Sequence, residues 1–172
     1  MFLHLTNVLT ADEVAQARAL LGESAPWRDG QASASGGAQA QKRNAQLDPD
    51  SPQAQQLRAL VLTAVQRDPL FLSAALPARV FNPLFNRYEG QANAYGLHTD
   101  AALLHSRHPA QWVRSDLSCT LFLSEPESYE GGELCVQDGA QERRFKLPAG
   151  DLILYPGHTL HQVLPVTRGT RL

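Results

Sequence analysis

The chain has 172 residues, which is enough for one domain with a substantial hydrophobic core. Hydrophobic residues make up 43% of the sequence and charged residues 19%, a composition typical of a globular protein. The 15 basic and 17 acidic residues give a formal charge of -2. This balance gives no electrostatic reason to expect nucleic acid or an anionic membrane as a partner.

Targeting and membrane segments are not visible in the sequence. The N-terminus lacks the basic start and apolar run of a secretory signal, and no stretch approaches the roughly 20 apolar residues of a membrane span. Cys119 and Cys135 lie in apolar, strand-like runs and are not closely spaced. We therefore predict reduced core thiols rather than a two-cysteine metal site, and a cytoplasmic protein.

Two helices are predicted in the first 70 residues. Thr10 and Glu13 form the pattern of a capping box ahead of the helical run 14–21. Ser51-Pro52 marks a second helix start, and apolar residues recur at helical spacing to about Asp68. The stretch between them, 28–41, is small, polar and glycine-rich, so we predict a mobile loop there, with a lid as the alternative.

Short strands separated by turn signals are predicted in the rest of the chain. This spacing favours a β sandwich or barrel, with the helices packed on one outer face and no linker between domains. The predicted strands are 80–88, 94–100, 117–123, 132–137, 142–147, 151–155 and 160–166.

The tripeptide His98-Thr99-Asp100 is the first candidate metal site. On a strand, side chains at i and i+2 share a face, so the imidazole and the carboxylate would lie side by side. One more imidazole would complete the two-histidine, one-carboxylate triad of non-haem Fe(II) enzymes. By itself the tripeptide is weak evidence for a metal site. In a chain of this composition, chance alone predicts about 0.6 pairs of a histidine and an acidic residue two positions later. A partly buried histidine beside a surface aspartate is the alternative.

Two later histidines compete for the third position. His158 follows the Pro156-Gly157 turn directly, whereas His161 begins an alternating run whose side chains share one face of a strand. We favour His161.

A fixed cation is the second requirement of such a centre. A dianionic ligand that chelates the metal with one end needs a cation for its far carboxylate, and a guanidinium offers two parallel hydrogen bonds. Arg171 lies on the strand that follows His161, while Arg168 precedes Gly169 in a predicted turn. We favour Arg171; a solvated surface charge is the alternative for both.

Taken together, these motifs resemble the PKHD-type hydroxylases, the PiuC-like group of Fe(II)/2-oxoglutarate dioxygenases related to prolyl and lysyl hydroxylases. The resemblance runs in order over nearly the whole chain. It rests on the stretches 83–88, 95–100, 116–124, 129–134, 147–156, 160–161 and 165–171.

The resemblance implies a double-stranded β-helix (jelly roll) and a dioxygenase that hydroxylates an unidentified substrate with succinate and CO2 as co-products. It places the Fe(II) ligands on His98, Asp100 and His161, and the 2-oxoglutarate arginine on Arg171. Tyr88 matches a tyrosine that binds the co-substrate in related prolyl hydroxylases, with a core aromatic as the alternative. L-ascorbate is included as a further cofactor.

The family pattern continues past its last arginine with the rest of that strand and a helical part, whereas this chain stops at Leu172. We therefore expect a single dioxygenase domain over 1–172 that lacks the C-terminal helical part, and fraying of the strand that carries Arg171.

The segment 101–115 is predicted to be a loop. His105 and His108 are read as solvated, Trp112 as lining a substrate mouth or anchoring the loop, and Arg114 with Asp116 as a structural pair. Two other functions are kept as alternatives: a cupin-like metal enzyme without 2-oxoglutarate, for which Arg171 would have no use, and a non-enzymatic iron or 2-oxoglutarate sensor.

Overall fold

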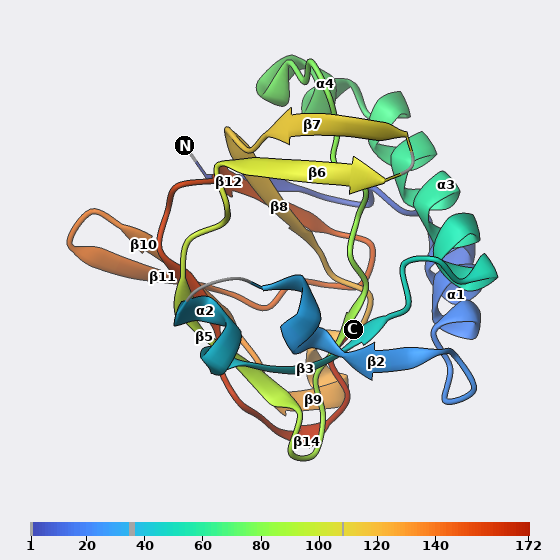
Figure 1. The fold of residues 1–172 in the computed structure, drawn as a ribbon, viewed down its shortest axis with the longest axis vertical. Helices are drawn as coiled ribbons and strands as arrows, with labels where there is room; N and C mark the ends of the chain where they lie inside the picture. The colour runs from blue at the N-terminus through green and yellow to red at the C-terminus, as the bar shows by residue number, and fades with distance from the viewer. Residues whose placement is uncertain (1, 35–36, 108) are drawn as a thin grey trace.

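The computed structural model describes residues 2–34, 37–107 and 109–172. Two β-sheets face each other, and helices α1 (Ala11–Leu20) and α3 (Pro52–Arg67) lie side by side on one flank (Figure 1). The prediction of a mainly β fold with N-terminal helices on one face is confirmed, and the arrangement is that of a double-stranded β-helix.

The strands and helices are short and follow one another closely. The strands are β1 (Leu3–Leu5), β2 (Trp27–Asp29), β3 (Lys42–Leu47), β4 (Asn86–Arg87), β5 (Asn93–His98), β6 (Leu103–Arg107), β7 (Ala110–Arg114), β8 (Leu117–Leu121), β9 (Tyr129–Gly131), β10 (Leu134–Asp138), β11 (Gln141–Phe145), β12 (Leu152–Pro156), β13 (His161–Val163) and β14 (Val166–Gly169). The remaining helices are α2 (Gly37–Gln41), α4 (Pro69–Ala75) and the 3₁₀ helices η1 (Gly30–Ser33) and η2 (Pro126–Ser128).

The larger sheet has the strand order β11-β10-β13-β5-β3-β2, and the smaller sheet has the order β1-β12-β8. Strand β12 is buried on both sides, because Leu152 and Leu154 pack toward the helices while Ile153 and Tyr155 pack between the sheets. Burial on both faces explains its unbroken apolar sequence. The fold therefore has an outer helix–sheet core and an inner core around which the site is built.

Both predicted helices are confirmed. Thr10 and Glu13 form a reciprocal capping box at the start of α1, and the Ser51 hydroxyl accepts a hydrogen bond from the Ala54 N–H at the start of α3. Helix α4 was not predicted. Asp68 ends α3 with extended backbone and at once caps α4, so two helices share one boundary residue.

The two predicted loops contain regular structure. The stretch 28–41 holds η1 and α2, although residues 35–36 lie outside the described part of the chain. Local hydrogen bonds order it: the Asp29 carboxylate accepts from Gln31 N–H, and the Ser33 hydroxyl donates to the Gly30 carbonyl. The stretch 101–115 contains the β6–β7 hairpin, which runs across one end of the molecule near α4 (Figure 1).

Two predicted strands have different limits in the structure. In the stretch 80–88 only β4 is a strand, and it pairs with β3 at two positions. The predicted strand 160–166 is two strands, since β13 pairs with β5 and β10 while β14 pairs with β9 in another sheet. Pro165 lies between them, where it has no N–H to give to a ladder.

Among the described residues, the structure has no helix of the length and apolar character that crossing a membrane requires.

Glu13 joins α1 to α3 and gives the first prediction. The Arg67 guanidinium donates to both Glu13 carboxylate oxygens, at 2.6 and 2.5 Å. This ion pair, and next the Thr10 N–H, lowers the pKa of Glu13 from 4.5 to about 2. A depressed folded-state pKa stabilises the protein above the unfolded value, and the stabilisation is lost as pH falls from about 4.5 to about 2.

We expect Glu13→Gln to lower the free energy of unfolding at pH 7 by about 1 kcal/mol, as for a partly solvated pair. The difference from wild type should shrink as the pH falls through that window, measured by urea unfolding at a series of pH values. A difference that is the same at pH 7 and pH 3 would contradict the ion-pair explanation.

Candidate metal centre

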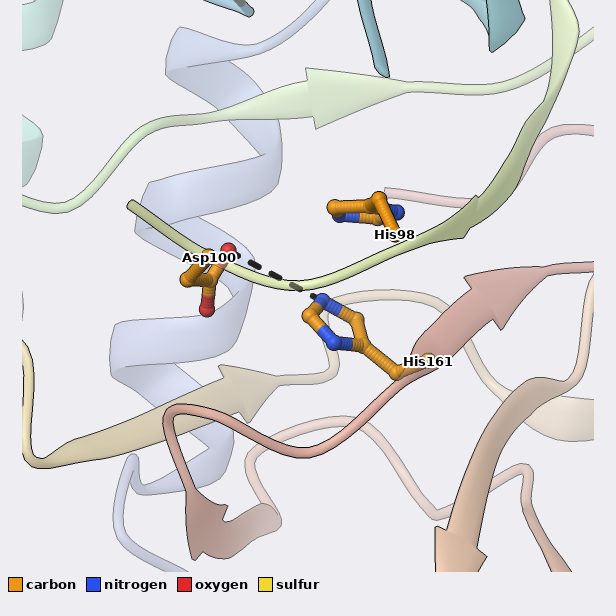
Figure 2. Close-up of side chains that lie close together, drawn as sticks. All are labelled: His98, Asp100 and His161. Carbon is orange, nitrogen blue, oxygen red and sulfur yellow. Dashed lines mark ion pairs between the residues drawn. The ribbon is translucent and has the colours of Figure 1, made fainter. Parts of the chain in front are cut away.

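His98 and Asp100 lie at the end of β5 and just beyond it. His98 is the last residue of the strand, and its side chain is 8% exposed. Thr99 is exposed, so the alternation of side chains continues for two residues past the ladder and leaves Asp100 on the same side as His98. Figure 2 shows both side chains on this one segment, next to His161 from β13.

The pairing of β13 with β5 places His161 directly opposite His98. The next pair is Val163 with Tyr95, so β5 has one more residue than β13 between the two pairs, which is a β-bulge. The bulge lets Tyr95 and His98 occupy the same side of the sheet, where their rings stack at 3.6 Å between centroids. The His98 and His161 rings lie 4.2 Å apart.

Both imidazoles have one nitrogen fixed by the backbone. His98 Nδ1 lies 2.8 Å from the Gly96 carbonyl oxygen, and His161 Nδ1 lies 3.0 Å from the Thr159 carbonyl oxygen. A carbonyl oxygen can only accept, so each Nδ1 carries the proton and each Nε2 keeps its lone pair. Each ring is thus held in the tautomer that binds a metal through Nε2.

The Asp100 carboxylate is oriented by Ser118 of β8. The Ser118 hydroxyl donates to Asp100 Oδ2, which leaves Oδ1 facing His161 Nε2 at 3.8 Å (Figure 2). Ligand atoms of His98, Asp100 and His161 all lie within 4.8 Å of one another, close enough for one cation to contact them together. Burial, followed by the neighbouring His161, lowers the pKa of His98 to about 4, which keeps this imidazole neutral at pH 7.

Arg171 lies in the interior of the same structure. It is 4% exposed, its Nε is buried, and among the described residues that Nε has no hydrogen-bond partner. Its guanidinium lies over the rings of Tyr88 and Phe122, at 5.0 and 5.5 Å from their centroids. A buried guanidinium without a carboxylate partner is costly, so its presence fits an anionic ligand that binds there.

Tyr88 is both a core aromatic and a neighbour of the cavity. It is 3% exposed, and its backbone exchanges two hydrogen bonds with Arg171, at 2.9 and 3.1 Å. Burial raises the pKa of Tyr88, and the Arg171 guanidinium opposes that shift. The hydroxyl is therefore protonated at neutral pH.

One cavity of about 1060 Å³ joins these groups. Its lining includes the three metal-ligand candidates together with Arg171 and Tyr88 (His98, Asp100, His161, Arg171, Tyr88). Two donor imidazoles, one carboxylate and a buried guanidinium in one cavity fit an iron ion and a 2-oxo diacid.

Comparison with known proteins identifies the family of the chain. The family model described as the 2OG-Fe(II) oxygenase superfamily matches residues 83–172. A PKHD-type hydroxylase of Phenylobacterium zucineum is 51% identical over 172 residues, which is all of this chain and 75% of that protein. The chain belongs to the PKHD-type hydroxylases. Homologues of the same name from Polaromonas sp. and Burkholderia cenocepacia are 50% and 52% identical, again over the full chain and 75% of their length.

As a member of this family, the protein is an Fe(II)- and 2-oxoglutarate-dependent dioxygenase, and the prediction of that activity, cofactor and co-substrate is confirmed. Solved structures agree on the fold. A prolyl-4-hydroxylase of Pseudomonas putida has a TM-score of 0.59 at 21% identity and covers 99% of this chain and 87% of that one. HygX of Streptomyces hygroscopicus, with nickel and 2-oxoglutarate bound, has a TM-score of 0.60 at 17% identity, over 99% and 79% of the two chains.

The residues that competed with these candidates lie elsewhere in this PKHD-type structure. His158 is exposed in the turn, and Arg168 is exposed and forms an ion pair with Glu130 at 2.7 Å. His105 packs edge-on against Trp112 in the β6–β7 hairpin, with ring centroids 5.0 Å apart. His108 lies outside the described residues.

The structural pair predicted from Arg114 and Asp116 is present, with Arg114 Nε 2.9 Å from Asp116. Trp112 is 61% exposed, lines the cavity and accepts a hydrogen bond from Arg79 through its carbonyl.

Sequence reasoning missed Ser118, Tyr95 and Lys42 around the PKHD-type centre. Ser118 is one of two hydroxyl residues in β8, with Thr120, and only the tertiary structure shows that it contacts Asp100. Tyr95 falls three residues before His98, which on a regular strand is the opposite face. Lys42, Asn44 and Gln46 alternate along β3, a pattern that in a sequence indicates a solvent-facing side of the strand. In the structure all three are buried.

The Ser118 contact gives the second prediction. Ser118→Ala removes the hydroxyl that holds the Asp100 carboxylate, and loss of such a supporting hydrogen bond costs about 10- to 100-fold in metal affinity. We expect that weakening in anaerobic Fe(II) titrations, with Ser73→Ala as the control, since the Ser73 hydroxyl bonds only to its own helix. Equal Fe(II) affinities of the Ser118 variant and wild type would exclude a positioning role.

Proposed function

We propose that this protein hydroxylates its substrate at an iron ion held by His98, Asp100 and His161, with Arg171 and Tyr88 binding 2-oxoglutarate. The observation that supports the proposal best is the pairing of His161 with His98 beside Asp100, in one cavity with a buried guanidinium whose Nε has no hydrogen-bond partner among the described residues. Bound iron and 2-oxoglutarate supply the oxygen activation, with O2 consumed and succinate and CO2 released.

The three proposed ligands leave half of an octahedral coordination sphere for other molecules. Two imidazole nitrogens and one carboxylate oxygen from the β5–β13 end of the sheet would hold the ion, and the cavity that they line would receive the other ligands. The Gly96 and Thr159 carbonyls keep the histidine rings from rotating, and Ser118 keeps the carboxylate from turning away. The protein thus contributes metal-binding side chains that are already held in place and need little rearrangement to bind iron.

Arg171 has the geometry to hold the far carboxylate of the co-substrate. Its guanidinium lies over the rings of Tyr88 and Phe122, and the Arg171 and Tyr88 backbones exchange two hydrogen bonds. A bidentate guanidinium–carboxylate contact would satisfy the buried donors that the fold leaves open. A cupin-like enzyme without 2-oxoglutarate would have no use for this arrangement, so Arg171 argues against that alternative.

The proposal extends to the setting of the reaction. We treat residues 1–172 as a single dioxygenase domain, since β12 takes part in both the outer and the inner core. Cys135 is buried as predicted, whereas Cys119 is exposed rather than in the core. We also propose a cytoplasmic location, because both are free thiols, the state that a reducing compartment maintains. L-ascorbate remains part of the proposal as a reductant of the iron between turnovers.

The metal assignment is tested with a matched pair of histidine variants. We expect His161→Ala and Asp100→Ala to lower 2-oxoglutarate-dependent succinate formation by more than about 100-fold, because loss of one of three ligands removes the iron. His158→Ala changes a histidine three residues away that is exposed in the turn, and should retain wild-type turnover. Succinate formation near the wild-type rate by Asp100→Ala would refute the ligand assignment.

The co-substrate assignment is tested with a matched pair of arginine variants. Arg171→Gln removes the buried charge, and we expect the KM for 2-oxoglutarate to rise by about 10- to 100-fold, as for the loss of a charge-assisted hydrogen bond. Arg168→Gln removes a surface charge paired with Glu130 and should leave that KM unchanged. The same KM in both variants would show that Arg171 does not bind the co-substrate.

A further inference from the structure

The charges around the cavity do not balance once iron and 2-oxoglutarate are bound. Iron, the Asp100 carboxylate, dianionic 2-oxoglutarate and the Arg171 guanidinium together carry no net charge. The charged side chains in the lining are Lys42, Arg79, Arg114, Arg171, Asp100 and Asp116. Arg114 and Asp116 pair with each other. Lys42 and Arg79 therefore remain as two positive charges that the holoenzyme does not neutralise.

Lys42 is the inner of these two cations. It begins β3, pairs across the ladder with Tyr95, and is 4% exposed. Its ammonium lies 5.1 Å from the centre of the Tyr95 ring, and Tyr95 stacks on His98. The lysine is thus one aromatic ring away from a proposed iron ligand, on the wall of the same cavity.

The ammonium of Lys42 has more hydrogen-bond donors than the described residues use. It donates to the Ser33 hydroxyl at 2.5 Å, and within residues 2–34, 37–107 and 109–172 no carboxylate lies within ion-pair distance of it. An ammonium has three donors, and a neutral hydroxyl satisfies one of them. Holding a buried charge in this way is costly unless a ligand completes the set.

The electrostatic surroundings agree with a charged lysine at neutral pH. Burial lowers the pKa of Lys42 to about 8, and the Asp100 and Asp29 carboxylates oppose the decrease. When iron neutralises Asp100, the cavity wall at Lys42 becomes still more positive, which favours an anion there.

Arg79 is the outer cation. It is exposed at the end of the chain segment that follows α4, and its guanidinium donates to the Trp112 carbonyl at 2.6 Å. This contact fixes it against the β6–β7 hairpin at the wall of the cavity. A carboxylate entering the cavity would meet Arg79 in solvent-exposed surroundings before it reaches Lys42.

We propose that Lys42 binds a carboxylate of the substrate, so that the enzyme hydroxylates an anionic compound or an acidic peptide segment. The inference rests on the proposed function, since it assigns the substrate class of the same site. The alternative ligand of Lys42 is the carboxylate of 2-oxoglutarate that would bind iron. The substrate is the better fit, because the two carboxylates of 2-oxoglutarate are already matched by iron and Arg171.

The test compares two probes that differ by a single charge, the capped tripeptides acetyl-Gly-Glu-Gly-amide and acetyl-Gly-Gln-Gly-amide. Both are titrated anaerobically into enzyme loaded with Fe(II) and 2-oxoglutarate, and binding is measured by calorimetry. We expect the glutamate peptide to bind about tenfold or more tightly than the glutamine peptide, the ratio for a charge-assisted hydrogen bond.

In Lys42→Met, which keeps the length and apolar stem of the side chain, this preference should disappear, and in Lys42→Arg it should persist. Arg43→Met is the matched control, since Arg43 is the next residue of β3 and is exposed on the opposite face. Thermal unfolding of each variant verifies that it is folded. Arg79→Gln should reduce the preference by a smaller factor, with a stronger dependence on salt.

Equal affinity of the two peptides for wild type, undetectable binding included, would overturn the inference, and so would a preference that Lys42→Met retains. A loss of 2-oxoglutarate affinity in Lys42→Met as large as that in Arg171→Gln would assign Lys42 to the co-substrate and also overturn it. Failure of the proposed function is a separate result: wild type would form no succinate from 2-oxoglutarate and Fe(II).

Discussion

The pairing of β13 with β5 is the constraint on which the rest of the site depends. It brings His161 opposite His98, and the continuing segment adds Asp100, so three donors from distant parts of the sequence share one place. The pairing is defined by backbone hydrogen bonds and by a bulge, not by the metal. A one-residue slip of β13 would turn the His161 side chain to the other face of the sheet. The relative positions of the three donors are therefore set by the register of the β5–β13 ladder.

The interior of the β-helix is polar around the proposed site and apolar around the inner core. Val136, Ile153 and Val163 fill the space between the sheets, whereas β3 contributes the buried polar residues Lys42 and Asn44, of which Lys42 lines the cavity. Asn44 Nδ2 donates to Asn86 at 2.8 Å, but its Oδ1 has no partner among the described residues. Buried polar groups with open hydrogen-bonding capacity usually indicate a functional site, because the fold alone gains nothing from them.

Much of the fold could be predicted from the sequence because local signals agree with it. The capping box at Thr10 and the Ser51-Pro52 start define the two main helices, and apolar alternation defines most strands of the inner core. Helix α4 escaped prediction because a strong helix ends where it begins, at Asp68. The β6–β7 hairpin was not predicted because the sequences of its two paired strands show little apolar alternation.

The candidate site was predictable for residues whose motif is local and not for those defined by tertiary contact. His98 and Asp100 are two residues apart, and His161 follows a turn signal, so sequence patterns suffice. Ser118 and Lys42 have no such motif. Their importance follows from which strands become neighbours, β8 beside Asp100 and β3 beside β5, and a single sequence does not contain that information in a readable form.

The position of Arg171 depends on contacts on both sides of its segment rather than on a long strand. Fraying was expected there, but the backbone of Arg171 pairs with Tyr88, while Leu172 N–H donates to the Ser124 hydroxyl at 3.0 Å. On the other side, the Thr170 hydroxyl donates to Glu89 at 2.7 Å. Glu89 and Tyr88 are neighbours in the chain, so one segment holds both the arginine and the residue before it. Because that segment leads directly into β5 and His98, the proposed co-substrate residue and the proposed iron ligands are positioned by the same short stretch of backbone.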